Sequence, residues 1–523
     1  MKKLYFGGPI LTMEPDAPRA DALLTDGPRI LALGDRDALR SAVPEAEPHD
    51  LDGAALLPAF TDPHSHFSQV ASGFLQLSME GVRTPDEFSR RVRAFAAARP
   101  DGWLFARGFD PTSGCPVPGL AELGSMAGGR PLVVQYASGH MGLFSPAALA
   151  ALGVTEKTPD PAGGRIGREN GRLTGYLEEK IYFDVLARAP GFSLAELTDG
   201  YRRAQALYFS RGITTVQEGM FVPEMLPMYQ ALLASGLLAL DLRAYPVPAA
   251  LPEVRRVFPV EMGHGSGRLR FPGLKIFLDG SPQGRTAWMR ADYDSQPGYR
   301  GYGTMEDAAV LDAMALAARE KLQLLAHCNG DAAAEQFLRC LAKSEARFPV
   351  LRELRPVLIH SQLIGLDQLP RVRELGAMCS FFPAHVWHWG DEHLKNFGET
   401  RARHCSPAAS ALRAGVPFTF HQDSPVVQPD MLETIWCAVC RVTKSGVPLG
   451  PEERIPVLEA LRAVTVNAAR QYFEEADKGS LSPGKRADLV ILSQDPAAVP
   501  PEKLRDILVL GTVRNGETVY VRE

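Results

Sequence analysis

Three side chains that can bind a metal ion or carry a proton follow a short apolar run in the stretch LLPAFTDPHSHF, residues 56–67. Asp62 comes first, and His64 and His66 follow with one residue between them. Because side chains alternate across an extended backbone, the two imidazoles face the same way and can meet one ion. An HxH pair on its own is more often solvated or hydrogen-bonded within the protein, so this stretch alone does not define a metal site.

Similar groups occur at the ends of other apolar stretches. Lys275 lies in LKIFLDG, His327 in LQLLAHC, His360 in PVLIHS and Asp423 in PFTFHQD. Each has an ordinary explanation on its own, because a histidine on an apolar strand is usually a hydrogen-bonded core residue and an aspartate can cap a turn. Burying several such groups without partners is unfavourable, so their recurrence at one end of five predicted strands indicates a metal site.

The central part of the chain alternates apolar strand patterns with helical patterns, which is typical of a parallel α/β architecture. Eight such units favour a (β/α)₈ barrel of the TIM type, in which catalytic groups come from the carboxyl ends of the strands. The predicted strands cover residues 55–62, 212–218, 242–247, 274–280, 322–328, 356–361, 377–382 and 417–423.

The two ends of the chain consist of short strand-like pieces separated by Pro, Gly and Asp turns. We therefore expect residues 1–55 and 478–523 to combine into one small β-sandwich domain beside a barrel over 56–477. The long gap between the first two barrel strands exceeds one crossover and predicts an insertion at about 67–200. Within it, the glycine- and arginine-rich residues 163–175 lack the GKS or GKT of a phosphate loop and predict a β-ribbon.

Composition argues against several classes of partner. The chain is 45% hydrophobic and 22% charged, with a net charge of -5 and no block of basic residues, so no nucleic-acid partner is predicted. No apolar window approaches the roughly 20 residues of a membrane span. Seven scattered cysteines indicate reduced thiols and a cytoplasmic location, and those of CAVC (437–440) are expected to be buried in an amphipathic helix.

The whole set of motifs resembles the amidohydrolase superfamily, which has an HxH on the first barrel strand, a lysine on the fourth, histidines on the fifth and sixth, and an aspartate on the eighth. Over nearly the whole chain the sequence is similar to the branch that contains N-substituted formamide deformylases and uncharacterised metal-dependent hydrolases. The similar stretches are KIFLDGSPQGRTA, HCNGDAA, FFPAHVWHWGDEH, HQDSPV and KGSLSPGKRADLVIL. The family's split β-sandwich agrees with the pairing of the two ends.

This resemblance implies an enzyme that hydrolyses a non-peptide carbon–nitrogen bond, in an amide or an N-substituted formamide, with a metal-bound hydroxide. It assigns His64 and His66 to one ion, His327 and His360 to another, and Asp423 to the first ion and to the role of base. Lys275 would bridge both ions after reacting with CO₂ to form a carbamate. The expected cofactor is two Zn²⁺ ions, with Mn or Fe as alternatives.

Six further residues are predicted to contact a small-molecule substrate. Some of the six lie in the insertion or in the loop after the fourth strand. For these, the alternative to substrate contact is that the side chain caps a turn or is exposed to solvent. Those after the seventh strand belong to HVWHWGDEH, whose rings suit an apolar substituent or, as the alternative, pack the loop itself. The six are His140, which matches a position at which the family contacts substrate, and Asp110, Asp279, Arg285, His385 and Trp389.

Two other classes of function stay open. A deaminase on the same barrel would use one ion to activate water against a ring or amidine carbon. Deaminases of this superfamily lack the bridging lysine and carry HxxE after the fifth strand, whereas His327 is followed by CNGD. A barrel that only binds ligands would have no reason to retain metal. The apolar helices are compatible with a homodimer without requiring one.

Overall fold

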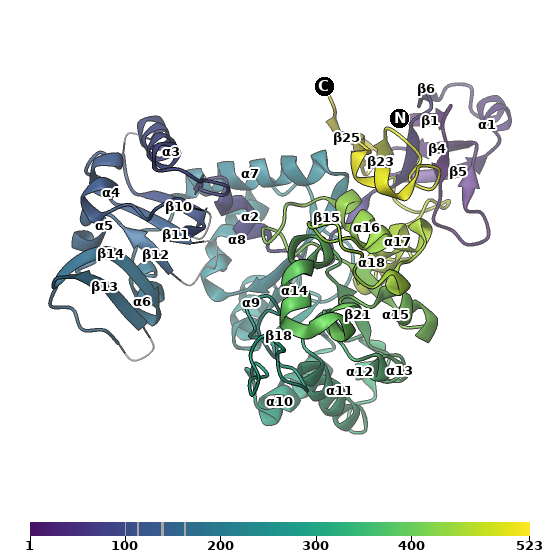
Figure 1. The fold of residues 1–523 in the computed structure, drawn as a ribbon. Coiled ribbons are helices and arrows are strands. Elements are labelled where there is room, and N and C mark those ends of the chain that lie inside the picture. Colours follow the sequence, from purple (N-terminus) through teal and green to yellow (C-terminus); the bar gives the residue numbers. More distant parts are fainter. Residues whose placement is uncertain (100, 112–113, 137–140, 162–163) are drawn as a thin grey trace. The chain divides into compact units, whose positions relative to one another are not determined.

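The computed structural model describes residues 1–523 except 100, 112–113, 137–140 and 162–163. The chain forms two compact units (Figure 1). The first consists of Met1–Gln69 with Ala204–Glu523, and the second of Val70–Arg203. Among the helices described, none combines the length and the apolar character that a bilayer crossing requires.

Parallel strands form the centre of the first unit. They belong to two sheets with the orders β17-β16-β15-β8 and β18-β19-β20-β21-β22. Backbone hydrogen bonds from His66 N to Ser424 O (2.8 Å) and from Asp423 N to His64 O (3.1 Å) join the segments after β8 and β22, so the first and last strands meet. The strands are β8 (Phe60–Thr61), β15 (Ile213–Phe221), β16 (Asp241–Pro246), β17 (Leu269–Arg270), β18 (Gly273–Phe277), β19 (Gln323–Cys328), β20 (Val357–His360), β21 (Met378–Phe381) and β22 (Phe418–Phe420).

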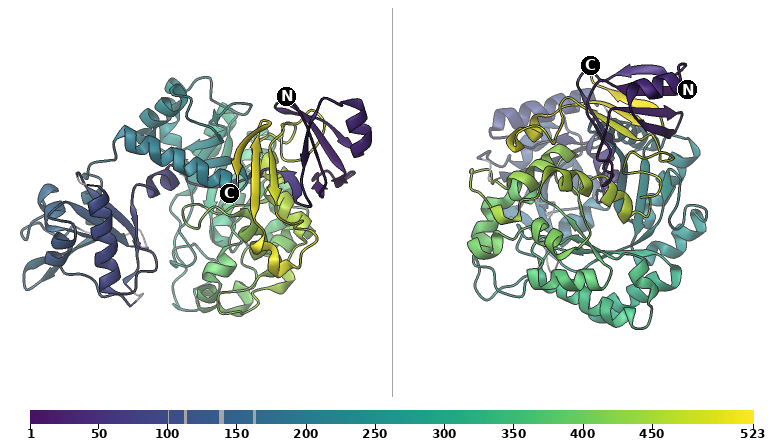
Figure 2. Two further views of the ribbon diagram at one scale, coloured as in Figure 1. Left: turned by 90° about the horizontal axis from the view of Figure 1, so that it is seen from above. Right: turned by 90° about the vertical axis from the view of Figure 1, so that its right-hand side faces the viewer.

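Helices alternate with these strands along the chain and lie on their outer side (Figure 2). In α11 (Asp331–Glu345), buried Ala333, Phe337 and Leu341 recur every fourth residue and form one apolar face. The other helices are α7 (Leu194–Ser210), α8 (Leu226–Ala234), α9 (Leu251–Val257), α10 (Asp307–Glu320), α12 (Val350–Glu353), α13 (Leu369–Glu374), α14 (His385–Ala402), α15 (Ala408–Ala414), α16 (Met431–Cys440), α17 (Val457–Ala463) and α18 (Val466–Gln471). The CAVC cysteines lie in α16 as predicted, with Cys437 buried and Cys440 partly buried.

The strand predicted over residues 55–62 is wrong as a single element, because the structure divides it. β7 (Ala55–Pro58) pairs antiparallel with β23 (Leu489–Leu492), and β8 pairs parallel with β15. Pro58 has no N–H to extend a ladder, and the chain changes partner just after it. Ala59 N still donates to Asp488 O beside β23, at 2.9 Å, whereas Phe60 N donates to Gly212 O beside β15, at 2.8 Å. The other seven predicted strands are each observed as one strand, with ends that differ by a few residues.

Strands from both ends of the chain lie side by side in one sheet, drawn purple and yellow in Figure 1. Its order is β25-β24-β23-β7-β2-β3, and a second sheet has the order β5-β4-β1-β6. Tyr5 and Leu23 of the second sheet share one apolar cluster with Leu56, Leu489 and Val513 of the first. The remaining strands are β1 (Lys2–Phe6), β2 (Ile10–Leu11), β3 (Arg19–Ala20), β4 (Ala22–Asp26), β5 (Arg29–Gly34), β6 (Glu47–Asp50), β24 (Val509–Arg514) and β25 (Glu517–Val521).

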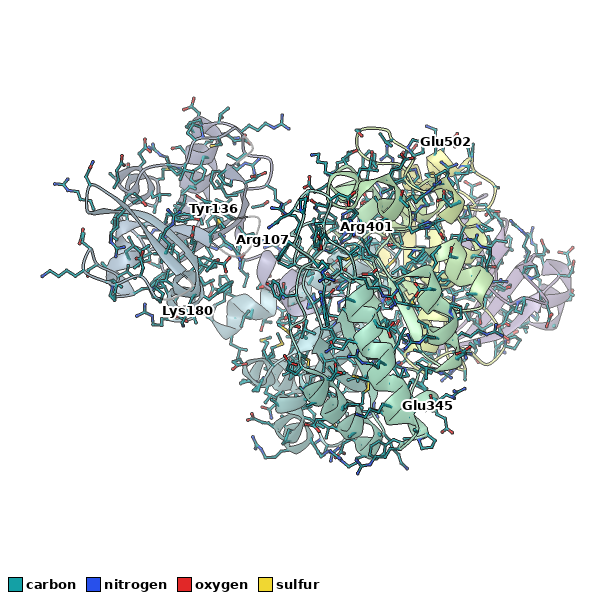
Figure 3. The ribbon with its side chains drawn as sticks, turned by 60° about the horizontal axis from the view of Figure 1, so that its bottom comes forward. Arg107, Tyr136, Lys180, Glu345, Arg401 and Glu502 are labelled. Carbon is teal, nitrogen blue, oxygen red and sulfur yellow. The ribbon has the colours of Figure 1, made fainter. Side chains whose placement is uncertain are left out.

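The second unit is built on a sheet with the order β13-β14-β12-β11-β10-β9. The ribbon predicted at 163–175 is confirmed over its described residues, because β13 and β14 pair antiparallel through Asn170 and Gly171, whose φ angles are 51° and 77°. Figure 3 labels Arg107, Tyr136 and Lys180 of this unit. Its elements are β9 (Leu77–Ser78), β10 (Leu104–Phe109), β11 (Leu132–Tyr136), β12 (Met141–Phe144), β13 (Gly164–Glu169), β14 (Arg172–Glu179), α3 (Pro85–Ala98), α4 (Leu120–Met126), α5 (Pro146–Ala151) and α6 (Lys180–Leu186).

Candidate metal centre

The six predicted ligands lie in or just after barrel strands. We call the group the candidate metal centre. In a TIM-type barrel the carboxyl ends of the strands meet at one rim, so side chains placed there converge although they are far apart in sequence. The members are His64 and His66 after β8, Lys275 in β18, His327 in β19, His360 at the end of β20 and Asp423 after β22.

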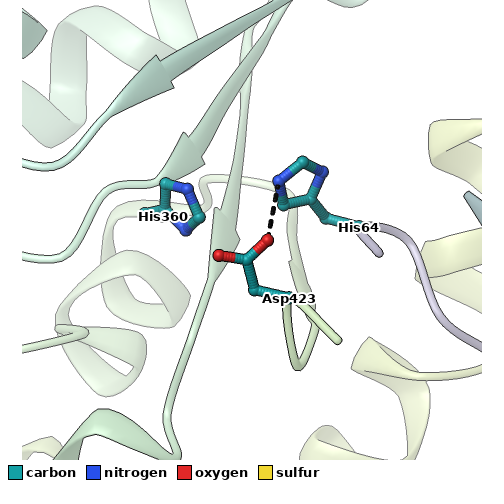
Figure 4. A group of neighbouring side chains, drawn as sticks. All are labelled: His64, His360 and Asp423. Carbon is teal, nitrogen blue, oxygen red and sulfur yellow. Dashed lines mark ion pairs between the residues drawn. The ribbon is translucent and has the colours of Figure 1, made fainter. Parts of the chain in front are cut away.

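The structure brings the imidazoles and the carboxylate close together. Oδ1 of Asp423 lies 3.3 Å from Nε2 of His64 and 3.2 Å from Nε2 of His66. Nε2 of His360 lies 3.1 Å from Nδ1 of His327. Ligand atoms of His64, His360 and Asp423 all lie within 4.8 Å of one another (Figure 4). Nitrogen and oxygen atoms at this spacing can share one or two small cations.

Two of these residues have a backbone conformation that interrupts the regular alternation of side chains along a strand. His360 has a φ of 73° and Asp423 a φ of 53°, and both residues stand at or just after a strand end. Left-handed backbone is unfavourable for residues other than glycine and occurs preferentially at functional sites. His and Asp adopt left-handed backbone more readily than most residues, so both positions can turn at the strand ends.

Gln217 in β15 fixes the orientation of His64. Its amide nitrogen donates to the carbonyl oxygen of Pro63 at 2.7 Å, so its Oε1 is free to accept a hydrogen bond. Nδ1 of His64 lies 2.6 Å from that oxygen and must carry the proton. The proton on Nδ1 leaves a lone pair on Nε2, which faces Asp423.

Lys275 is the least satisfied member of the group. Its side chain has no exposed surface, and within the described part of the chain its Nζ has no hydrogen-bond partner. Burial lowers the pKa of Lys275 to about 7, although the negative charge of Asp423 opposes this shift. A large share of the amine is therefore unprotonated at neutral pH, which is its nucleophilic form.

Burial also sets the charge of the other groups. It lowers the pKa of His64 and of His360 well below the usual range, and that of His327 to about 4. Burial would raise the pKa of Asp423, but a hydrogen bond with His66 holds it well below its usual range. Neutral imidazoles and an ionised carboxylate are the forms that bind divalent cations.

Asp279 and Arg285 follow β18. The Asp279 carboxylate accepts backbone N–H bonds from Trp288 (3.0 Å), Asn329 (2.9 Å) and Gly330 (2.7 Å), so it ties together the loops after β18 and β19. Arg285 is exposed and has a φ of 57°. A contact of either residue with substrate stays a prediction.

The other predicted substrate residues fall in different places. His385 and Trp389 lie in α14 with ring centroids 4.5 Å apart. The ring of Phe382 lies 4.7 Å from His385 and 6.4 Å from His360, so His385 is one ring removed from the candidate metal centre. Asp110 follows β10 in the second unit, and His140 lies outside the described residues.

Sequence reasoning missed two residues that touch the candidate metal centre. His421 has no exposed surface, and its ring centroid lies 5.0 Å from those of His64 and of His360. One residue separates His421 from Asp423, which is the same spacing as between His64 and His66. Gln217 lies near the carboxyl end of the predicted strand GITTVQE, and this position is the signal that could have identified it.

Comparison with known proteins identifies the family. Residues 48–520 match the family model Amidohydro_3, described as the amidohydrolase family. The chain therefore belongs to the amidohydrolase family, which makes it a hydrolase and confirms the resemblance found in the motifs.

Individual relatives cover nearly the whole chain. The putative amidohydrolase YtcJ of Bacillus subtilis is 26% identical over 539 residues and 99% of each chain. An N-substituted formamide deformylase of Arthrobacter pascens is 29% identical, covering 96% of this chain and 95% of that protein. The crystal structure of an uncharacterised metal-dependent hydrolase from Pyrococcus horikoshii superposes with a TM-score of 0.81 at 24% identity, covering 96% and 99% of the two chains. The fold is therefore the TIM-type barrel of amidohydrolases.

Proposed function

We propose that this protein hydrolyses a non-peptide carbon–nitrogen bond in a simple amide or an N-substituted formamide, with divalent metal ions at the candidate metal centre. The observation that carries this proposal is that four histidines and Asp423 lie close together at the strand ends, beside a buried lysine whose amine makes no hydrogen bond among the described residues. The deformylase activity named for the Arthrobacter relative supports the substrate class.

The donor atoms fit a bound cation. Nε2 of His64 presents a lone pair to Oδ1 of Asp423 at 3.3 Å, and two acceptors at this distance repel each other unless a cation lies between them. A cation bound there would remove this repulsion.

The same argument extends to a second ion. We assign His64, His66 and Asp423 to the first ion, and His327 and His360 to the second. Lys275 becomes a ligand of both if its amine forms a carbamate with CO₂, which replaces a cation by an anionic oxygen donor. Imidazole and carboxylate ligands suit Zn²⁺, with Mn or Fe as alternatives.

The residues of the chain have separate roles in the reaction. Bound ions would supply a Lewis acid that polarises the substrate carbonyl and acidifies a water molecule. The ionised carboxylate of Asp423 accepts the proton of the attacking water and passes it to the nitrogen of the leaving amine. Gln217 holds the ring of His64 in place, while His385 and Trp389 contact the substituent of the substrate. Asp110, His140, Asp279 and Arg285 are proposed as further substrate contacts.

We also propose that the two terminal sheets form one β-sandwich, made of residues 1–55 and 478–523. Support comes from the sheet that both ends share and from the apolar cluster common to both sheets. The barrel then covers residues 56–477, with an insertion at about 67–200.

The test combines elemental analysis of the purified protein with a screen of N-substituted formamides, simple amides and aminopyrimidines. We expect about two divalent ions per chain and turnover of a formamide or an amide. Turnover of aminopyrimidines alone, with one ion per chain, would identify a deaminase instead. Absence of both metal and turnover would indicate a barrel that only binds ligands.

A further inference from the structure

Two buried histidines of α14 form a pair that the resemblance does not use. Nδ1 of His385 lies 3.0 Å from Nε2 of His393, and the two rings are stacked at 8° with centroids 5.3 Å apart. His393 has no exposed surface and His385 is 4% exposed. One of the two facing nitrogens must carry a proton, because two lone pairs at this distance repel each other.

The surroundings of His393 decide which nitrogen carries that proton. Burial lowers the pKa of His393 to about 3 and that of His385 well below its usual range, so each ring carries a single N–H at neutral pH. If His385 donated from Nδ1, His393 would carry its proton on Nδ1. That atom is buried and has no hydrogen-bond partner in the described part of the chain.

A buried N–H without an acceptor is unfavourable and rarer than an unsatisfied acceptor. The alternative tautomer avoids this N–H. His393 then donates from Nε2 to Nδ1 of His385, and the single proton of His385 lies on its Nε2.

Nε2 of His385 is available to a ligand. Among the described residues nothing accepts a hydrogen bond from it, and it is not one of the buried side-chain nitrogens that lack a partner. The His385 ring packs against Phe382 and Trp389, and the Phe382 ring also lies 5.1 Å from His421 and 6.4 Å from His360. The free N–H therefore belongs to the wall beside the candidate metal centre.

We propose that His393 is a positioning residue that holds His385 as the Nε2–H tautomer, so that His385 donates a hydrogen bond to the carbonyl oxygen of the substrate. This inference rests on the proposed hydrolysis of an amide or a formamide. The oxygen gains negative charge as water attacks the carbonyl carbon, so the N–H binds it more strongly in the transition state than in the bound substrate. The contribution therefore falls mainly on kcat.

Nitrogen NMR of the zinc-loaded protein tests the tautomer without reference to activity. In protein labelled with ¹⁵N-histidine, and with the His385 signals identified by their loss in His385→Gln, we expect a protonated Nε2 and an unprotonated Nδ1. The two tautomers should mix in His393→Phe, whose ring cannot donate. His393→Gln should restore the original signals, because its amide can donate to Nδ1. A proton on Nδ1 of His385 in the unaltered protein would overturn the proposal.

Kinetics then test the consequence. His393→Phe should lower kcat/KM for the formamide or amide by about 10- to 100-fold, the range for residues that orient a functional ring, and His393→Gln should recover most of the loss. His388→Phe is the matched control, because His388 lies on the same helix but pairs with Glu433 at 2.8 Å. An equal loss in His388→Phe would overturn the role of His393. If no formamide or amide is turned over, the proposed function fails, but the NMR comparison still decides the tautomer.

Discussion

The first unit holds two buried groups of charged or titratable side chains, and they differ in how far the protein satisfies them. One is the candidate metal centre at the carboxyl ends of the strands. The other, which we call the ionic cluster, surrounds Asp241 at the amino end of β16. In barrels of this type the carboxyl end carries catalysis and the amino end carries stability. The ionic cluster consists of Asp241, Arg243, Glu474, Lys478, Arg486, Asp488 and Arg514.

Every carboxylate of the ionic cluster has a cation next to it. Asp241 lies 3.0 Å from Nζ of Lys478 and 2.7 Å from a guanidinium nitrogen of Arg486, and it also contacts Arg514. Burial would raise the pKa of Asp241, but the positive charges of Lys478 and the neighbouring arginines outweigh it and hold the pKa well below its usual range. Nε of Arg486 and Nε of Arg514 are buried without a hydrogen-bond partner among the described residues. The protein nevertheless supplies a counter-charge for each carboxylate, so no ligand is needed to balance the charge of this network.

The candidate metal centre has the opposite character. Within the described residues, Nζ of Lys275 and both ring nitrogens of His421 are buried without a hydrogen-bond partner, and two acceptors face each other at Asp423. Folded proteins rarely leave buried polar groups without a hydrogen-bond partner, and each exception requires an explanation such as a bound ligand. The comparison teaches that burial and charge do not mark a functional site by themselves. Every side chain of the ionic cluster makes at least one hydrogen bond or ion pair, whereas the Lys275 amine and the His421 ring make no hydrogen bond among the described residues.

The largest expected effect is on turnover. Asp423→Asn keeps the size of the side chain but removes the negative charge and the proposed base, so activity should fall to the limit of detection while the thermal unfolding midpoint changes little. His64→Ala should have the same effect on activity and also lower the retained metal. Initial rates, elemental analysis and thermal unfolding check both variants, and a normal rate in either would refute its role.

A matched pair of lysine substitutions tests the comparison directly. Lys478→Met leaves Asp241 and Glu474 short of a cation, so we expect it to destabilise the fold by about 3–5 kcal/mol. Lys275→Met removes a buried amine without a partner, so the metal-free protein should become more stable by about 1–3 kcal/mol while activity is lost. Urea unfolding of the metal-free variants measures both changes. Equal destabilisation by the two substitutions would show that the regions do not differ as proposed.

From the sequence we could predict those residues of the candidate metal centre that lie next to a recognisable strand pattern. Residues at strand ends, such as His327 and His360, could be identified because apolar runs locate the strands and the barrel brings their ends together. The ionic cluster had no such signal, since Asp241 and Lys478 are 237 positions apart and each resembles an ordinary surface charge. The contact of His385 with His393 also depends on how α14 packs, which periodicity does not specify.

A smaller effect is expected at Gln217, which acts only through His64. Gln217→Leu removes the acceptor of the Nδ1 proton, so His64 is free to change tautomer and kcat/KM should fall by about 10- to 100-fold. Tyr472→Phe is a graded control, because the hydroxyl of Tyr472 accepts from the Gln217 amide at 3.1 Å without contacting His64. We expect it to change kcat/KM far less. Equal losses would mean that general packing, and not the proton on Nδ1, orients the ring.

The pH dependence of stability separates the buried ring of His393 from the ionic cluster by its range. Both lower the stability as the pH falls, because in both cases the unfolded state takes up protons first, but they do so in different pH windows. Burial lowers the pKa of His393 to about 3, whereas an unfolded chain has a histidine pKa of about 6.5. Below pH 6.5 the unfolded state therefore binds a proton that the folded state does not. Each such histidine should reduce the stability of the metal-free protein by about 1.4 kcal/mol for each unit of pH below that point.

Asp241 should contribute nothing to this slope. Its folded pKa lies below the unfolded value of about 3.9, so its stabilisation is complete above that pH and is lost only as the pH falls through the folded pKa. Between pH 7 and pH 5, the urea unfolding midpoint should decline less steeply in His393→Phe than in the unaltered protein. Asp241→Asn should lower the midpoint at every pH and leave the decline unchanged. A decline in His393→Phe as steep as in the unaltered protein would mean that this buried ring does not remain neutral in the folded state at pH 5.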